Sequence, residues 1–264
     1  MAKSFSIVTA TLNHAPFIGD AIRSVLDQRY PNLEYIVIDG GSTDGSVDLI
    51  RKYSSSIHYF VSEKDAGHAN ALNKGFRNAS GEIMGWINSD DKYLPWAFRT
   101  ASDIFEEFPD INWIVGTNSW LNDKGAMIGA ANTYNNIFDY LSGKCFGIQQ
   151  ESVFWRRPLW EKAGASINEH YRFMVDAELW TRFFLLDELW HVNCVFAGYR
   201  MHQANRAITF RTECISEISQ AISAMRGKLD PNKLTRLENN YRSLSYDQQT
   251  SRWVKQLVPR QPNG

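Results

Sequence analysis

The sequence predicts an α/β fold with a mainly parallel sheet covered by helices on both faces. Four short apolar, β-branched runs occur between residues 5 and 87, and segments with helical spacing of apolar residues separate them. Alternation of this kind is typical of parallel sheets, whose strands are buried on both faces. The hydrophobic content of 44% and the aromatic content of 13% are sufficient for a large core.

The first part of the chain predicts four strands and three helices. Tyr30-Pro31 ends the first helix, and the turn residues Ser42, Thr43 and Asp44 are candidates to cap the second. The expected strands are residues 5–10, 35–38, 57–61 and 83–87, and the expected helices are residues 18–26, 47–53 and 69–79.

The second part is less regular. We expect helices at 97–108, 158–164 and 178–186, strands at 113–121 and 152–156, a hairpin turn at 122–125 and extended chain at 190–201. From about residue 204 the pattern changes, with one apolar helix face, a polar helix from Pro231 and a basic amphipathic piece at 251–258. The sequence therefore predicts a domain of residues 1–205 and a helical C-terminal extension of residues 206–264.

Composition limits the class of protein. The 28 Lys and Arg residues nearly balance the 29 Asp and Glu residues, giving a net charge of −1, which argues against nucleic acid as the main partner. Three scattered cysteines without a CxxC pair indicate buried thiols in a reducing compartment. With no signal-like start and no run of about 18 apolar residues, we expect a cytoplasmic protein, with contact at the inner face of the membrane left open.

Polar residues follow the ends of the predicted strands. Asn13, Asp39, Asp65 and Asp90 each come just after a strand. Because ligands of parallel sheets bind beyond the carboxyl ends of the strands, we expect these side chains to share one rim.

Two adjacent carboxylates, Asp90 and Asp91, close the strand in the stretch GEIMGWINSDDKYLP. They repel each other unless a cation or a donor lies between them, and oxygen ligands of this kind suit Mg²⁺ or Mn²⁺. The alternative is a solvated turn, since Ser-Asp-Asp is good turn chemistry.

Other motifs narrow the chemistry. No GxGxxG follows the first strand and no Walker lysine motif is present, so dinucleotide and P-loop chemistry lose support. Asp176 and Glu178 precede the segment LWTRFF and are candidates for a general base; the alternative is favourable charge in the first turn of a helix.

These residues carry a resemblance to the family 2 nucleotide-sugar glycosyltransferases, inverting enzymes of the GT-A fold. It covers roughly residues 4 to 205. The matching segments, in family order, are SIVTATLNHAPFIGDAIRSVLDQ, YIVIDGGSTDGS, SEKDAGHANALNKGF, ASGEIMGWINSDDKYLP, QESVFWRRPLWEKAG, VDAELWTRF and YRMH. The resemblance implies a GT-A, Rossmann-like sheet flanked by helices.

The resemblance also implies residue roles on the donor side. Thr9, Asn13, Asp39 and Asp65 would line the nucleotide pocket, with Asp39 meeting the uracil. The NSDD corner would be the metal motif, although Asn88 stands where many relatives have the first Asp of Asp-X-Asp. We therefore favour Asp90 as the metal ligand and Asp91 as the second choice, with Asn88 touching ribose or sugar.

On the acceptor side the resemblance makes Asp176 the base, although Val175 replaces the Glu that usually precedes it. His202 would reach the metal or the diphosphate. Gln150, Glu178 and Trp180 would lie toward the acceptor.

The sequence as a whole predicts an inverting transferase that uses Mn²⁺ or Mg²⁺. It would move a sugar from a UDP-linked donor to a glycan or lipid-linked acceptor in cell-surface polysaccharide synthesis. The alternatives are a nucleotide-sugar-binding protein without turnover, motivated by Asn88 and Val175, and a metal-dependent nucleotidyltransferase. The C-terminal helices would pack on their own domain, on a second copy of the chain or on an anionic membrane.

Overall fold

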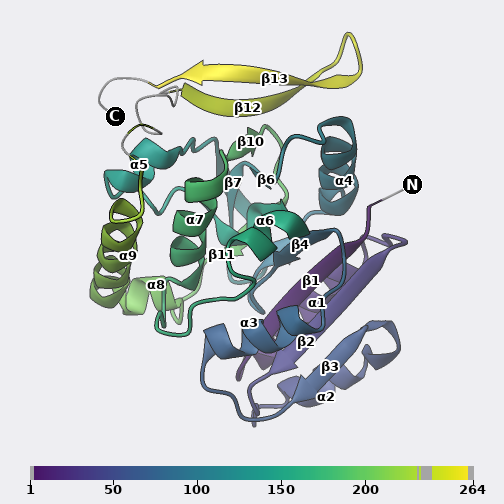
Figure 1. The fold of residues 1–264 in the computed structure, drawn as a ribbon. Helices are drawn as coiled ribbons and strands as arrows, with labels where there is room; N and C mark the ends of the chain where they lie inside the picture. Colours follow the sequence, from purple (N-terminus) through teal and green to yellow (C-terminus); the bar gives the residue numbers. More distant parts are fainter. Residues whose placement is uncertain (1–2, 231, 233–239, 261–264) are drawn as a thin grey trace.

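The computed structural model describes residues 3–230, 232 and 240–260, and within them the chain forms a nine-stranded sheet (Figure 1). Its strands are β1 (Phe5–Thr11), β2 (Leu33–Asp39), β3 (Tyr59–Ser62), β4 (Ile83–Trp86), β6 (Trp113–Val115), β9 (Val153–Arg156), β10 (Trp190–Val192), β12 (Asn240–Asp247) and β13 (Arg252–Pro259). They are ordered β13-β12-β10-β6-β9-β4-β1-β2-β3. β9 is antiparallel to β4 and β6, β13 is antiparallel to β12, and the other neighbouring pairs are parallel. The predicted mainly parallel sheet is confirmed.

Helices cover both faces of this sheet. One face carries α1 (Ala15–Leu26), α2 (Ser46–Arg51) and α4 (Ala97–Glu107), and the other carries α3 (His68–Arg77), α5 (Ile137–Leu141), α6 (Arg157–Lys162), α7 (Val175–Leu186) and α9 (Arg211–Arg226). β1 is buried throughout, so Ile7 packs in one core and Val8 in the other. α3 approaches the sheet closely at Gly75, where a Cβ atom would lie 2.4 Å from Cγ1 of Val8.

A smaller, four-stranded sheet packs beside the first. It contains β5 (Lys92–Tyr93), β7 (Asn118–Leu121), β8 (Met127–Ala131) and β11 (Ala197–Arg200), in the order β5-β11-β7-β8. The single strand predicted over 113–121 is wrong, because the chain leaves the large sheet at Gly116 and enters the small one. A Cβ atom at Gly116 would lie 2.8 Å from the Cys194 carbonyl oxygen, so the crossing requires glycine. The hairpin turn predicted at 122–125 is confirmed by the Gly125 N–H, which donates to the Asn122 carbonyl (2.9 Å).

The region after residue 205 is only partly helical. α8 (Arg206–Thr209) and α9 are helices as expected, but 240–259 form a hairpin that extends the large sheet beside β10 (Figure 1). The helical extension predicted for 206–264 is wrong over 251–258, because residues 252–259 pair with β12 as an antiparallel strand. Trp253 packs against the core, and Lys255 Nζ lies 2.6 Å from Asp110 Oδ2.

Three further expectations for this region stay predictions. The polar helix expected from Pro231 lies outside the described residues. The domain boundary at residue 205 and the contact of the C-terminal helices with a membrane or a second copy are not tested by the structure.

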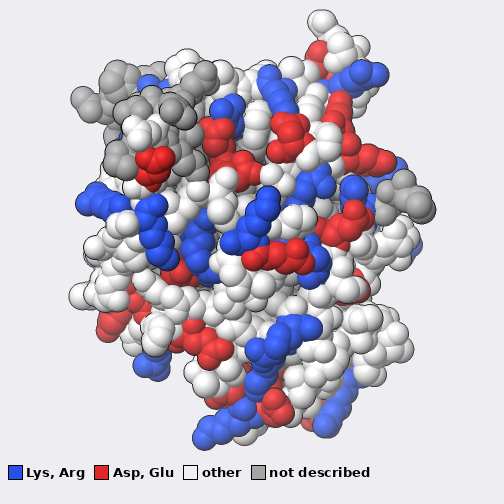
Figure 2. Space-filling model, viewed as in Figure 1, with Lys and Arg blue, Asp and Glu red and all other residues white. Residues whose placement is uncertain are grey.

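The described residues contain no helix with both the length and the apolar character that a membrane crossing needs. On the face shown in Figure 2, Lys and Arg side chains are interspersed with Asp and Glu. That mixture agrees with the net charge of −1.

Candidate active site

A tight corner between β4 and β5 brings two carboxylates to the carboxyl edge of the large sheet. The Ile87 N–H still donates to Val8 of β1 (2.9 Å), and the chain then turns so that the Asp91 N–H donates to the Asn88 carbonyl (3.2 Å). Asp91 is 1% exposed, whereas the Asp90 side chain is 15% exposed. Asp90 is therefore the more accessible carboxylate.

Arg200, at the end of β11, fixes this corner. Its backbone N–H donates to Asp91 Oδ1 (2.8 Å) and its Nε donates to the Asp90 carbonyl (2.6 Å). The guanidinium also donates to the Asp123 carbonyl (2.8 Å) and pairs with Asp20 (3.1 Å). A buried arginine with all these partners holds β11 against three other segments, at residues 20, 90–91 and 123.

Asp91 is held as a structural group. Asn88 Nδ2 donates to its second oxygen at 3.3 Å. Burial, followed by the negative charge of Asp90, raises the pKa of Asp91 well above its usual value. Asp91 is therefore poorly placed to act as the principal ligand of a cation.

His202 meets Asp90 from the other side. Its Nε2 lies 3.0 Å from Asp90 Oδ2, and its ring stacks on Phe17 with centroids 4.7 Å apart. From the β1–α1 loop, His14 Nδ1 lies 2.7 Å from Ser89 Oγ. The structure thus gathers the predicted residues Asp90 and His202 with the loop after β1.

The residues of this corner fit a divalent cation. Asp90 offers a carboxylate oxygen and His202 an imidazole nitrogen, a donor set that suits Mn²⁺ and, through the carboxylate, Mg²⁺. Among the described residues no group of three or more His, Cys, Asp or Glu side chains is arranged to hold a metal ion. A cation here would therefore complete its coordination with substrate oxygens and water.

The loops after β1 and β2 are joined by side-chain hydrogen bonds. Asn13 has a left-handed backbone (φ 54°), and its Oδ1 accepts from the Thr43 N–H (2.9 Å) while its own N–H donates to Ser42 Oγ (2.8 Å). Asp65 lies at the same edge: a Cβ atom at Gly40 would lie 2.6 Å from Asp65 Oδ2. The predicted residues Asn13, Asp39 and Asp65 are therefore neighbours.

Asp39 is fully buried and its carboxylate is already occupied. It accepts from the N–H groups of Gly41 (3.0 Å) and Ser42 (2.9 Å), from Ser62 Oγ (2.7 Å) and from Ser42 Oγ. These contacts match the turn-capping alternative, which is compatible with a further contact to a nucleotide.

The two threonines of β1 differ in their placement. Thr9 is fully buried, and its hydroxyl accepts from Tyr35 Oη (3.1 Å), so it supports the sheet below the rim. Thr11, which the sequence interpretation missed, ends the strand opposite Asp39. Its buried Oγ1 finds no hydrogen-bond partner among the described residues.

Asp176 is half-buried in the first turn of α7. Burial, with a smaller contribution from the charge of Glu217, raises its pKa to about 6. The pKa of the Tyr199 hydroxyl is raised by burial and then by the charges of four carboxyl groups, those of Asp91, Asp90, Glu151 and Asp176. The charges of the predicted base and of the carboxylates at the β4–β5 corner therefore act on the same hydroxyl.

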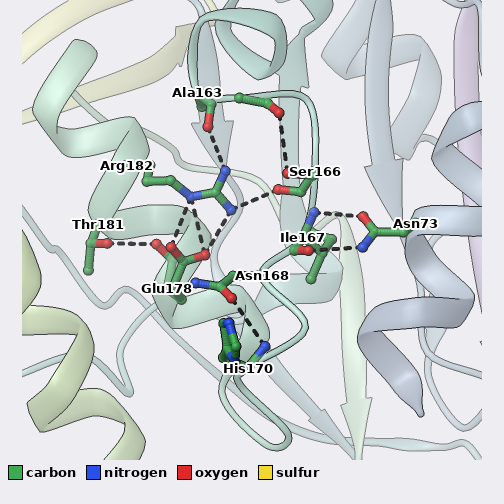
Figure 3. A network of polar contacts seen from close by, with 10 residues as sticks. Asn73, Ala163, Ser166, Ile167, Asn168, His170, Glu178, Thr181 and Arg182 are labelled. Atoms are coloured by element: carbon green, nitrogen blue, oxygen red, sulfur yellow. Dashed lines mark hydrogen bonds and ion pairs between the residues drawn. The ribbon is translucent and has the colours of Figure 1, made fainter. Parts of the chain in front are cut away.

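Glu178 and Gln150, predicted on the acceptor side, both have structural contacts. Glu178 pairs with Arg182 (2.8 Å), which also donates to the carbonyls of Ala163 (2.6 Å) and Ser166 (2.9 Å) (Figure 3). Gln150 Nε2 donates to the Trp86 carbonyl at 2.6 Å, while its buried Oε1 has no partner among the described residues. Glu178 therefore matches the structural alternative.

The acceptor-side role of Trp180 stays a prediction, because the structure shows this residue only as part of the core. Its side chain is fully buried and stacks on Trp86 with ring centroids 5.7 Å apart and an interplanar angle of 16°.

Glu151 is the carboxyl group that the sequence interpretation missed. It lies in the 3-10 turn Gln150–Ser152 and is 2% exposed, with Oε1 unpaired among the described residues. Burial, and then the charges of Asp176 and Asp90, raise its pKa to about 8. In the sequence, the only feature that could have pointed to Glu151 is its place as an acidic residue just before an apolar strand.

A family model described as "Glycosyl transferase family 2" matches residues 6–190. Among curated relatives, an uncharacterised glycosyltransferase of Rickettsia typhi is 27% identical over 214 residues, which cover 77% of this chain and 66% of the relative. A putative teichuronic acid biosynthesis glycosyltransferase of Bacillus subtilis is 37% identical over 91 residues, which cover 33% of this chain and 36% of the relative. The chain thus spans less than two thirds of the length of both relatives.

Two solved structures share the fold. S. aureus TarS in complex with UDP-GlcNAc superimposes with a TM-score of 0.68 at 15% identity, covering 84% of this chain and 66% of that one. A mannosyltransferase of Pyrobaculum calidifontis in complex with GDP-Man and Mn²⁺ gives a TM-score of 0.66 at 18% identity, covering 88% of this chain and 67% of that one. At these identities the similarity is one of fold.

Proposed function

The chain belongs to glycosyl transferase family 2, and on this premise we propose that it is an inverting enzyme of cell-surface polysaccharide synthesis. It transfers a sugar from a UDP-linked donor to a hydroxyl of a glycan or lipid-linked acceptor. The observation that carries the proposal is the pairing of Asp90 with His202 at the carboxyl edge of the sheet, where the His202 ring stacks on Phe17 of α1. The Asp90–His202 pair is suited to a metal-bound diphosphate, and the Asp176 carboxylate is suited to accept the proton of the acceptor hydroxyl.

The donor would lie along the rim. The loops that carry Asn13, Asp39 and Asp65 lie beyond the ends of β1, β2 and β3, where parallel sheets bind nucleotides. Asp90 and His202 would hold Mn²⁺ or Mg²⁺, which supplies positive charge to the diphosphate leaving group. Asn88, beside Asp91, would contact the ribose or the sugar.

The reaction is a single displacement. The Asp176 carboxylate accepts the proton of the acceptor hydroxyl while that oxygen attacks the anomeric carbon of the donor. The bond from the anomeric carbon to the diphosphate oxygen breaks, and its electron pair leaves with the nucleoside diphosphate. Attack from the face opposite the leaving group inverts the configuration.

Val175, in place of the usual Glu, does not weaken this proposal. Its side chain is 3% exposed and packs in the core, so the substitution removes a carboxylate neighbour of Asp176 without disturbing α7.

Assays with nucleotide sugars test the proposed function. In a thermal-shift panel with Mn²⁺, a donor at ~100 times its Kd adds about 2.7 kcal/mol to the free energy of unfolding. Single-turnover assay with mass detection then separates transfer from binding alone. Release of a nucleoside diphosphate supports a glycosyltransferase, whereas release of pyrophosphate from a nucleoside triphosphate would identify a nucleotidyltransferase.

The acid limb of the pH profile should report Asp176. Because burial raises its pKa to about 6, the unprotonated base is lost below that pH, and kcat/KM should fall about tenfold per pH unit. The acid limb lies at a higher pH than an ordinary aspartate would give, because burial raises the pKa of Asp176. A rate that stays constant down to pH 4.5 would exclude Asp176 as the base.

Asp39→Ala should weaken the binding of the donor and of free UDP together, by roughly 10-fold or more for a lost hydrogen bond to a charged group. The substitution also leaves the Gly41 and Ser42 amides unpaired, so a lower melting temperature is expected. Calorimetry with UDP makes the measurement. Asp44→Ala is the control, because Asp44 accepts from Ala15 and Ser46 amides near the same loop. Equal UDP affinity in both variants and the wild type would leave Asp39 with its turn-capping role alone.

A further inference from the structure

The segment before the base is held by a helix outside the residues that the family model matches. α9 lies beside α7 (Figure 1), and its Glu217 accepts hydrogen bonds from three successive backbone amides. The N–H of Arg172 donates to Oε1 (2.8 Å), and those of Phe173 (2.9 Å) and Met174 (2.8 Å) donate to Oε2. Met174 is the N-cap residue of α7, which has no side-chain cap of its own.

Two more side chains of the same region contact this segment. Arg206 Nη2 donates to the Arg172 carbonyl (3.0 Å), and its guanidinium lies 5.1 Å from the Phe173 ring. Phe210 packs on Phe173 with centroids 4.8 Å apart. Residues 206–217 thus contact the segment 172–174 in three ways. They accept from its backbone N–H groups, donate to one of its carbonyls and pack on the Phe173 side chain.

This arrangement bears on Asp176 because Asp176 is only two residues beyond Met174. A shift in the backbone of 172–174 would move the carboxylate relative to the acceptor hydroxyl, and misplacement by about 1 Å can cost up to ~100-fold in rate. The attachment of α9 itself does not need Glu217, since the buried Cys214, Ile218, Ile222 and Met225 pack it on the domain. Glu217 therefore has a task separate from that packing.

We propose that Glu217 is a positioning residue for the base, and that α9 completes the active site by fixing the segment 172–174. The inference rests on the proposed function for Asp176 as the base. It also gives the C-terminal region a role in turnover that the matched residues 6–190 alone do not provide.

Glu217 also acts on Asp176 through its charge. The groups whose charges interact with that of Asp176 are Glu217 and Cys214 of α9, Glu151 of the 3-10 turn, Tyr140 of α5, Cys145, and Tyr199 of β11. The negative charge of Glu217 raises the pKa of Asp176. Removing that charge should therefore shift the acid limb of kcat/KM to lower pH.

The test compares Glu217→Gln with Glu213→Gln, which makes the same charge change one turn earlier on the exposed side of α9. Kinetics against pH, UDP affinity with Mn²⁺ and hydrogen exchange of the 172–174 amides are measured for both. For Glu217→Gln we expect kcat to fall by about 10- to 100-fold, an acid limb at lower pH, faster exchange at 172–174 and unchanged UDP affinity. Glu213→Gln should match the wild type in all four.

Unchanged UDP affinity shows that the Glu217→Gln variant is folded, so a fall in kcat cannot come from loss of structure. Exchange at 172–174 as slow as in the wild type would overturn the contact itself. Faster exchange with wild-type kcat and pH profile would overturn the positioning role. A wild-type chain without any sugar transfer would overturn the proposed function, and the exchange rates would still decide whether Glu217 holds the segment.

Discussion

Asp176→Asn is expected to lower kcat by about 10²- to 10⁴-fold, the contribution that a positioned general base makes. Asparagine keeps the shape of the side chain but cannot accept the acceptor proton. Donor affinity should stay at the wild-type value, because the base touches the acceptor hydroxyl and not the nucleotide. Steady-state kinetics combined with calorimetry of UDP binding makes the measurement, and the acid limb near pH 6 should disappear in the variant.

Glu178→Gln is the matched control for this prediction. Glu178 lies two residues along the same helix, and its carboxylate is used by Arg182 (Figure 3). Its substitution should lower the melting temperature and leave kcat near the wild-type value. If Glu178→Gln were inactive and Asp176→Asn active, the two roles would have to be exchanged. Wild-type rates in both would exclude this acidic segment from catalysis.

Asp90→Asn is expected to abolish the Mn²⁺-dependent part of UDP binding while leaving the fold intact. Loss of a residue that merely supports a metal ligand costs about 10- to 100-fold in metal affinity, so loss of the ligand should cost at least as much. Binding isotherms of UDP with and without Mn²⁺ give the difference directly.

Asp91→Asn distinguishes the role of Asp91 from that of Asp90. An asparagine Oδ1 still accepts from the Arg200 N–H, as Asp91 does now (2.8 Å), so the corner should persist and Mn²⁺ dependence should be largely retained. Metal-dependent turnover in both single variants would show that this corner is not the metal motif.

The first half of the fold is predictable because its strands are buried on both faces. Runs such as Phe5–Thr11 and Leu33–Asp39 are short, apolar and bounded by turn residues, a combination that favours strands over helices. Parallel pairing then fixes the edge at which Asp39 and Asp90 must lie. The rim could therefore be placed without knowledge of a single side-chain contact.

Trp180 shows where this reasoning stops. Its place on the acceptor side was implied by the family resemblance and not by a pattern in the sequence. The helix α7 is apolar nearly all round, and residues 177–181 and both phenylalanines are buried. The apolar pattern of α7 therefore does not show which of its faces is accessible.

Long-range polar contacts are the other part that the sequence does not reveal. Arg200 meets partners 77, 109, 110 and 180 residues away, and Glu217 meets amides 43 to 45 residues away. No local pattern marks such pairs. The strands at 240–259 were missed for a related reason. Leu244 is buried because β12 pairs with β10, and no local pattern marks that pairing.

The attachment of the β4–β5 corner to Arg200 sets an order of events during synthesis. Asp90 leaves the ribosome 110 residues before Arg200, an interval of roughly 5 to 20 s at about 5–20 residues per second. During that interval β1, β2 and β4 can already pair, because they lie within the first 86 residues. The nascent chain thus acquires the loops after β1 and β2 early, whereas the β4–β5 corner is braced only once the end of β11 has emerged.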